Sequence, residues 1–196
     1  MVLIILRHGQ TNWNKNKILT GLEDIDLNEH GVKETKEISK ILKKYNFDYI
    51  FCSNLQRSIV TTNIIKNELN TNCIVKHSAK LNVKNHGFLT GKPIKELENI
   101  YTPETVKKWC KSYYGIPPNG ESLYEVKKRC GTYFDETIKP LLKENKNILI
   151  ISHSSTLKSL LVHLGLKEEN IIEDFEIGNC KPINIDLVNK KYSFIL

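Results

Sequence analysis

No apolar run in the sequence is long enough to cross a membrane. The runs VLIIL at 2–6 and ILII at 148–151 are much shorter than the ~20 apolar residues that a spanning helix needs. Met1 leads directly into the first run, without the basic start and the small-residue cleavage site of a secretory signal. We therefore expect a cytoplasmic protein with no membrane partner.

Paired cysteines are also absent. The five cysteines are widely scattered, and none forms a Cys-x-x-Cys pair (Cys52, Cys73, Cys110, Cys130 and Cys180). This pattern disfavours both a disulfide framework and a zinc site. We expect these side chains to act as small apolar residues in a core, and we expect no bound metal.

Positive charge is in excess but is not concentrated anywhere. The chain has 29 Lys and Arg against 22 Asp and Glu, which gives a net charge of +7. The lysines occur singly or in pairs, as in KETKEISKILKK at 33–44. This spacing is typical of solvated helix faces and disfavours a nucleic-acid partner, although the excess charge fits anionic ligands.

Short strand patterns alternate with helical patterns along the chain. The strand candidates are rich in Ile and Val and lie at 2–7, 48–53, 73–77, 148–152 and 183–188. Apolar residues recur at helical spacing at 30–45, 55–69, 121–138 and from Ser155 to Gly165. The alternation predicts an α/β fold over residues 1–196, a single-domain three-layer sandwich. Its central sheet should be mostly parallel, with helices on both faces, and 192–195 could add an antiparallel edge strand.

Residues 81–120 form the least regular part of the chain, rich in glycine and proline. We expect a loop-rich cover segment there, with one short helix at 103–113, placed to cover a site. The sequence contains no internal repeat and no low-complexity tract.

Polar side chains follow three of the predicted strands. Arg7 and His8 end the first strand, Ser53 ends the second, and His153 follows the strand at 148–152. Ligands of open α/β sheets bind beyond the carboxyl ends of the strands, so these side chains should meet at one rim. Arg57, early in the helix after the second strand, belongs to the same group.

These residue types predict phosphoryl transfer. Taken alone, Arg7 and His8 would fit a sheet-capping histidine and a paired arginine. Two histidines and two guanidinium groups around one crevice instead suit an oxyanion, with further donors from amides near Ser155. A neutral imidazole is a competent nucleophile near pH 7, and arginines can stabilise the transferring phosphoryl group without a metal.

Four segments resemble motifs of the histidine phosphatase superfamily, in its phosphoglycerate mutase-like branch. They are LRHGQTNWN at 6–14, LTGLEDIDLNEHG at 19–31, SNLQRSIVTT at 53–62 and IISHSSTLKSLL at 150–161. The resemblance is strongest to the cofactor-dependent phosphoglycerate mutases and covers about residues 2–80 and 109–188.

The resemblance implies roles for individual residues. His8 would become phosphorylated, and Arg7, Arg57 and His153 would hold the transferring group. Substrate contacts are implied for Asn14, Thr20, Gly21, Ser154 and Ser155. Outside its motif, Asn14 would be interpreted as a loop or helix-cap residue. The implied partner is a small phosphorylated metabolite or a phosphoprotein, and a homodimer is compatible with the pattern.

The chain departs from this family at the usual general acid/base. The family has a glutamate in a stretch resembling Leu-Asn-Glu-Arg-x-x-Gly-x-Leu-x-Gly, whereas this chain has LNVKNHGFLTG at 81–91. Val83 and Lys84 therefore replace the glutamate and the arginine, and valine cannot transfer a proton. General acid–base catalysis is worth ~10²–10⁴-fold, so turnover should be slower. His86 and Glu121 are candidate replacements, and a site without any replacement is the alternative.

A second departure concerns the substrate. The mutases have a basic pair before SYDIPPPP, where this chain has WCKSYYGIPP at 109–118, with Cys110 and Lys111, and a shorter segment follows. Fewer cations and less cover favour hydrolysis of the phosphohistidine. The sequence thus favours a metal-independent phosphomonoester phosphatase without a cofactor. The alternatives are a glycolytic mutase primed by 2,3-bisphosphoglycerate, and a weak or inactive homologue that binds phosphorylated ligands or proteins.

Overall fold

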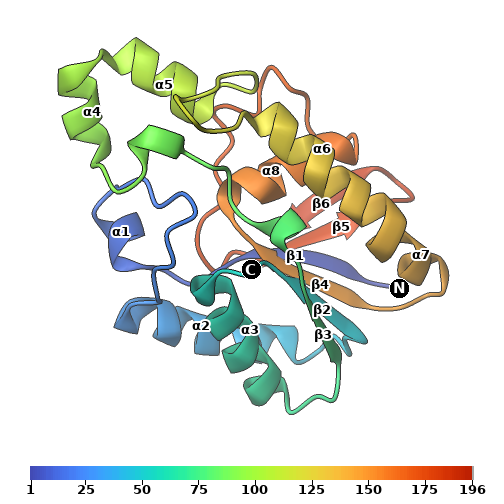
Figure 1. Ribbon diagram of the computed structural model, residues 1–196. Helices are drawn as coiled ribbons and strands as arrows, with labels where there is room; N and C mark the ends of the chain where they lie inside the picture. Colours follow the sequence, from blue (N-terminus) through green and yellow to red (C-terminus); the bar gives the residue numbers. More distant parts are fainter. Residues whose placement is uncertain (196) are drawn as a thin grey trace.

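A six-stranded sheet forms the centre of the molecule (Figure 1), in a computed structural model that describes residues 1–195. The strands are β1 (Leu3–Arg7), β2 (Tyr49–Cys52), β3 (Ile74–His77), β4 (Ile148–Ser152), β5 (Ile183–Asp186) and β6 (Lys191–Phe194). Their order is β3-β2-β4-β1-β5-β6. Only β5 runs against its neighbours, β1 and β6. The predicted mostly parallel sheet with an antiparallel edge is confirmed.

Helices cover both faces of the sheet. The longer ones are α2 (Glu29–Leu42), α3 (Gln56–Leu69), α6 (Leu123–Tyr133) and α8 (Ser154–His163). Leu3 and Ile5 of β1 pack in the core under α6 and α8, whereas Ile4 and Leu6 pack against α2 and α3. Because successive strand residues face opposite sides, a fully apolar strand is what a sheet covered on both faces requires.

The predicted helix at 121–138 is divided in the structure. It continues from α6 through a π-helical turn, η3 (Phe134–Ile138), into α7 (Lys139–Lys143). Pro140 lies at the start of α7 and has no N–H for the preceding turn, which explains the change of hydrogen-bonding pattern.

The cover segment is more regular than the sequence predicts. It contains α4 (Ile94–Ile100) and α5 (Pro103–Lys111), where only one helix at 103–113 was expected, and the short turn η2 (Gly87–Leu89). The turn η1 (Ala79–Leu81) leads into it. Leu89, Leu97 and Val106 form a small core of their own between the two helices. Seven residues are too few for periodicity to reveal α4. The four-residue α1 (Asn12–Lys15) escapes prediction for the same reason.

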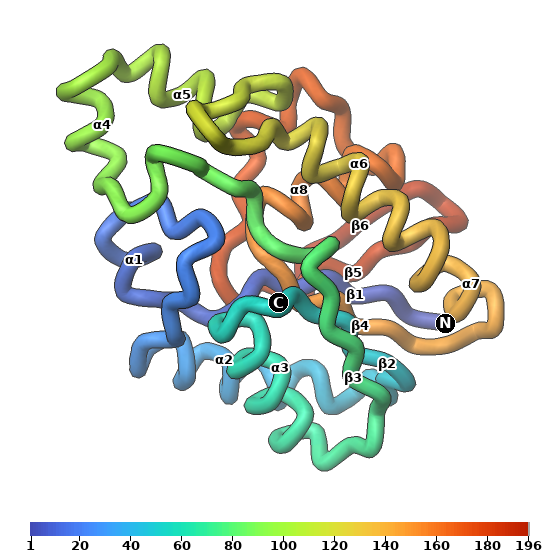
Figure 2. Tube along the Cα trace, in the orientation of Figure 1, coloured from blue at the N-terminus to red at the C-terminus, as the bar shows by residue number. Residues whose placement is uncertain are grey.

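The cover segment spans the carboxyl edge of the sheet. Figure 2 traces it, in green to yellow, from the end of β3 past α1 to the start of α6. On the α1 side its backbone is bound to the loop after α1, because Leu19 N–H donates to Lys92 O and Gly91 N–H donates to Leu19 O.

Most cysteines are buried, and so are two lysines. Four of the five cysteines are buried as expected, and Cys110 is half-buried. The expectation that the lysines are solvated is wrong for Lys84 and Lys158, which are 0% and 9% exposed. Within residues 1–195, no helix is long and apolar enough to cross a membrane.

Candidate active site

Three strand ends bring the two histidines together. Arg7 of β1 is paired in register with Ser152 of β4, and His8 N–H donates to Ser152 O at 3.0 Å. His153 follows immediately. The rings of His8 and His153 have their centroids 5.0 Å apart, and the two residues are only 2% and 1% exposed. The rim expected from the sequence therefore exists.

His8 has one nitrogen fixed and one free to react. Nδ1 donates to the carbonyl of Gly9 at 2.7 Å, so the lone pair lies on Nε2. Burial, with the charges of Arg7 and Arg57, holds the pKa of His8 well below its usual value. The imidazole is therefore neutral at neutral pH. This is the form that can act as a nucleophile.

Gly9 lets the backbone beside His8 approach α2. A Cβ at this position would lie 2.7 Å from Gly31 O and from Thr35 Oγ1. The glycine of the Arg-His-Gly sequence is thus required by close packing.

The tautomer of His153 is set by its two neighbours. Arg57 Nε donates to its Nδ1 at 3.3 Å, so the proton of the neutral ring lies on Nε2. That nitrogen lies 2.8 Å from Ser53 Oγ and donates to it. The pKa of His153 is also well below its usual value, through burial first and then through Arg57.

Arg57 connects the histidine pair to the loop after α1. It lies in the first turn of α3, is 1% exposed, and donates to Gly21 O at 3.0 Å and Glu23 O at 2.8 Å. Burial lowers its pKa to about 10, so the guanidinium remains charged at neutral pH. Thr20 and Gly21, the predicted substrate contacts, are buried in this loop.

Arg7 has donor capacity to spare. One of its terminal nitrogens donates to Ile177 O at 2.8 Å, while its buried Nε has no partner. Burial lowers the pKa of Arg7, and the carboxylates of Glu34 and Glu176 oppose this effect. A buried unpaired N–H beside two histidines is well suited to an anionic ligand.

The remaining predicted contacts lie around this centre. Asn14 belongs to the capping box of α1, as its alternative interpretation suggested, and its Oδ1 also lies 3.3 Å from Asn179 Nδ2. Ser154 and Ser155 begin α8. Asn179, which donates to His8 O at 2.8 Å, was not singled out by sequence reasoning and has no local signal that would reveal it.

The loop that carries Val83 is held at every residue. Ser152 Oγ donates to Leu81 O and Thr156 Oγ1 donates to Asn82 O, both at 2.7 Å. The next three bonds are Arg129 Nη2 to Val83 O at 2.9 Å, Lys84 N–H to Ser155 Oγ at 3.0 Å, and Asn85 N–H to Glu121 Oε1 at 2.8 Å. We call residues 81–85 the valine loop. It is fixed beside the start of α8.

Neither candidate acid/base is set up to donate a proton. Both carboxylate oxygens of Glu121 accept bonds from Arg129, at 2.8 and 3.2 Å, and one also binds Asn85 N–H. His86 is buried, and its Nδ1 has no partner. Burial and the charge of Lys84 lower the pKa of His86 to about 3, so it is neutral at neutral pH.

The side chain of Lys84 is directed at the end of α5 and at the loop that follows α5. Its Nζ donates to Trp109 O at 2.7 Å and to Gly115 O at 3.1 Å. Burial lowers the pKa of this ammonium group to about 8. Lys84 thus ties the end of α5 to the valine loop.

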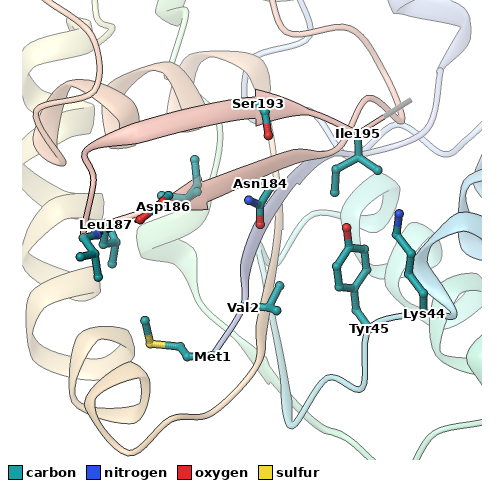
Figure 3. Close-up of a pocket in the computed structure, with 11 residues that line it drawn as sticks. Met1, Val2, Lys44, Tyr45, Asn184, Asp186, Leu187, Ser193 and Ile195 are labelled. Atoms are coloured by element: carbon teal, nitrogen blue, oxygen red, sulfur yellow. Dashed lines mark hydrogen bonds between the residues drawn. The ribbon is translucent and has the colours of Figure 1, made fainter.

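The pocket in Figure 3 lies away from the histidines. Its volume is about 680 Å³, and Met1, Val2, Lys44, Tyr45 and Asn184 are among its lining residues, at the amino end of β1. None of the predicted site residues lines it. Among residues 1–195, no three His, Cys, Asp or Glu side chains are grouped so as to hold a metal ion.

The family model of the histidine phosphatase superfamily (branch 1) matches residues 3–195. The chain belongs to this superfamily. Curated relatives of this chain are named 2,3-bisphosphoglycerate-dependent phosphoglycerate mutase, and two of them serve as examples. The one from Cytophaga hutchinsonii is 36% identical over 163 residues, covering 83% of this chain and 76% of the relative. The one from Chlamydia caviae is 34% identical over 207 residues, covering 92% and 91%.

Solved structures of similar fold are named as phosphatases. A mycobacterial glucosyl-3-phosphoglycerate phosphatase, in complex with VO3, has a TM-score of 0.87 at 21% identity, covering 100% of this chain and 97% of the other. The alpha-ribazole phosphatase from Shigella flexneri has a TM-score of 0.80 at 24% identity, covering 100% and 95%. The fold predicted from the sequence is that of the superfamily, and the chain is an enzyme of the histidine phosphatase and phosphoglycerate mutase-like type.

Proposed function

We propose that this histidine phosphatase hydrolyses phosphomonoesters through phospho-His8 and needs no metal ion. The observation that carries the proposal is a neutral, buried His8 with a free Nε2 lone pair, beside His153 and two arginines. Nε2 attacks phosphorus, and the leaving-group oxygen departs with the electron pair of the broken phosphorus–oxygen bond. The guanidinium groups of Arg7 and Arg57 neutralise charge on the transferring phosphoryl group. Water then attacks the phosphohistidine and releases phosphate.

Hydrolysis is favoured over mutase activity by the state of Lys84. A mutase must hold a doubly anionic substrate and return its phosphoryl group before water intervenes. Lys84, which replaces the arginine of the resembling stretch, donates to two backbone carbonyls and has no exposed surface. The ammonium group of Lys84 is therefore bound to the protein's own backbone and is not free to bind an anionic group of a substrate.

Mutase activity is the second candidate, because the curated relatives carry that name at 34–36% identity. In that case 2,3-bisphosphoglycerate would prime His8, and the product would be 2-phosphoglycerate from 3-phosphoglycerate. A coupled assay with primed enzyme distinguishes the two: the proposal expects phosphate release without conversion. Conversion that outpaces release would establish the mutase instead.

The test of the phosphatase is the loss of activity in His8→Ala. The native chain should release phosphate from 4-nitrophenyl phosphate in EDTA, and mass spectrometry of quenched turnover should find a phosphoryl adduct on His8. His8→Ala should reduce release to background. Equal rates in the two proteins would exclude the mechanism. Binding of phosphate without any release by the native chain would favour the inactive homologue that Val83 suggests.

A further inference from the structure

The valine loop is firmly held, yet Val83 at its centre has no proton to donate, and the Lys84 ammonium group is bound to Trp109 O and Gly115 O. Each residue of the loop is bound to the end of β4, the start of α8, α6 or Glu121. Thr156 and Ser155 bind it directly after His153, and Asn54, directly after Ser53, donates its N–H to Asn82 Oδ1 at 3.0 Å. The loop is therefore bonded to the residues that directly follow His153 and Ser53, and Val83 lies at its centre. An isopropyl group at this place can only pack.

The carboxylates close enough to influence the active-site charges are all bound elsewhere. Asp24, near Arg57, accepts the N–H of Gln56 at 2.7 Å. Glu176, near Arg7, is exposed and lies 3.8 Å from Lys111 Nζ. Glu121 is occupied by Arg129, as described above. None of these three is placed to give a proton to a leaving group.

Glu34 is the remaining carboxyl group close enough to influence Arg7. Burial raises its pKa, so it holds a proton more readily than an exposed glutamate does. Its Oε1 accepts the N–H of Gln10 at 2.6 Å, and its Oε2 lies 3.8 Å from His30 Nε2. Both oxygens thus face groups on α2 and the loop after β1. Glu34→Gln removes its proton and keeps its shape.

The basic side chains near the site are directed elsewhere too, including Lys158, whose Nζ donates to Glu173 O at 3.5 Å. The rings of His8, His86 and His153 are neutral, because burial lowers all three pKa values. The single ring proton of His153 is directed at Ser53. The ammonium group of Lys84 faces the carbonyls of the cover segment.

We propose that the enzyme acts on phosphoryl donors whose leaving group is stable as an anion, namely acyl phosphates, phosphoric anhydrides and aryl phosphates. This proposal rests on the phosphohistidine mechanism proposed above and names its substrate class. Alkyl phosphates, including ordinary sugar phosphates, release an alkoxide that needs a proton as the bond to phosphorus breaks. The site lacks that proton.

The chemistry balances without an acid. The Nε2 lone pair of His8 forms the nitrogen–phosphorus bond, and the electron pair of the broken phosphorus–oxygen bond leaves on the carboxylate, phosphate or phenolate. Nδ1 keeps its proton and its bond to Gly9 O throughout. In the second step water oxygen attacks phosphorus, the nitrogen–phosphorus electron pair returns to Nε2, and H₂PO₄⁻ departs with both protons of the water.

The experiment compares donors whose leaving groups differ in basicity. Native protein, in EDTA, is given acetyl phosphate, 4-nitrophenyl phosphate, phenyl phosphate and an alkyl phosphate such as glycerol phosphate. We expect kcat/KM to fall steeply along this series. The native series alone tests the proposal, so it does not depend on any variant folding. A flat series that still requires His8 would overturn the proposal and leave the phosphohistidine mechanism intact.

Matched variants at position 83 identify the missing proton as the cause. Val83→Glu should raise the rate on the alkyl phosphate by ~10²–10⁴-fold and leave the rate on acetyl phosphate nearly unchanged. Val83→Gln, which has the same shape without the proton, should keep the steep series. Equal gains from the two variants would contradict the proposal.

Two further controls separate the possible failures. Glu34→Gln should keep the native series; loss of alkyl phosphate hydrolysis in this variant would identify Glu34 as a proton donor and overturn the proposal. Release from no donor at all, or release that His8→Ala does not reduce, would overturn the phosphohistidine mechanism together with the substrate class that rests on it.

Discussion

The protonation pattern of His153 is decided by single atoms around it. A neutral imidazole has one N–H and one lone pair, and Arg57 takes the lone pair while Ser53 takes the proton. Ser58 Oγ also lies near Nε2, but at 3.5 Å. Ser53 therefore positions the ring of His153, which in the proposed mechanism lies beside the phosphoryl group.

Replacing Ser53 by alanine should impair turnover. The buried Nε2–H would lose its acceptor, and a net hydrogen bond is worth ~1 kcal/mol, so kcat on 4-nitrophenyl phosphate should fall by about fivefold with little change in KM. Ser58→Ala is the matched control, because its oxygen is farther away. A larger loss in Ser58→Ala than in Ser53→Ala would contradict this account.

The convergence of the candidate site residues was predictable from the sequence, whereas the residues that support them were not. His8, Arg57 and His153 each follow a recognisable strand pattern, and parallel strands bring their ends to one edge. Asn179 and Arg129 depend on contacts between segments far apart in the chain, for which neither residue type nor spacing gives a signal. The burial of Lys84 is likewise a tertiary effect.

At the scale of elements, Lys84 fixes the cover segment at its α6 side. Trp109 O belongs to the last turn of α5, where carbonyls lack helical partners and the helix dipole is negative. Gly115 brings the following loop against the same turn, because a Cβ there would meet Lys108 O. The ammonium group thus binds a helix end and a loop at once.

Lys84→Met should loosen the cover segment and leave the sheet intact. Methionine keeps the length of the side chain but leaves the carbonyls of Trp109 and Gly115 unpaired. We expect faster amide exchange and faster proteolysis across 101–118, with unchanged protection in β1 and β4. Lys92→Met is the control, since Lys92 only stacks on Phe88 within the same segment. Similar rates of amide exchange in Lys84→Met and Lys92→Met would show that Lys84 does not hold the cover segment in place.

Sequence patterns predicted the long elements well and the short ones badly. The strands and α2, α3 and α8 have enough residues for an apolar period to appear. The cover helix α4 has seven residues, and its apolar side chains pack against α5 rather than against the sheet. Because this packing is local, the spacing of apolar residues in α4 does not differ from the spacing in a loop.

At the scale of the whole molecule, stability is linked to three buried neutral histidines. The pKa values of His8, His86 and His153 are all lowered in the folded protein. Below pH ~6.5 the unfolded chain binds protons at these positions and the folded chain does not. The three neutral histidines therefore stabilise the folded state above pH ~6.5, and this stabilisation is lost as the pH falls below that value.

The free energy of unfolding should decrease between pH 7 and pH 5. Each histidine should contribute on the order of 1 kcal/mol per pH unit below ~6.5. Urea titrations at several pH values measure this slope, and Lys84, with a pKa of about 8, stays protonated throughout the range. His86→Gln should reduce the slope by about one third. A slope that is the same in native protein and in His86→Gln would refute this linkage.

The strand order also has a consequence for how the protein is made. β1 leaves the ribosome first, but both of its hydrogen-bonding neighbours, β4 and β5, lie beyond residue 147. Until β4 has been made, the apolar strand that ends at His8 consequently lacks its partners in the sheet. A nascent chain stalled before β4 would carry His8 but not His153, so the proposed reactive centre is complete only after β4 and His153 have been made.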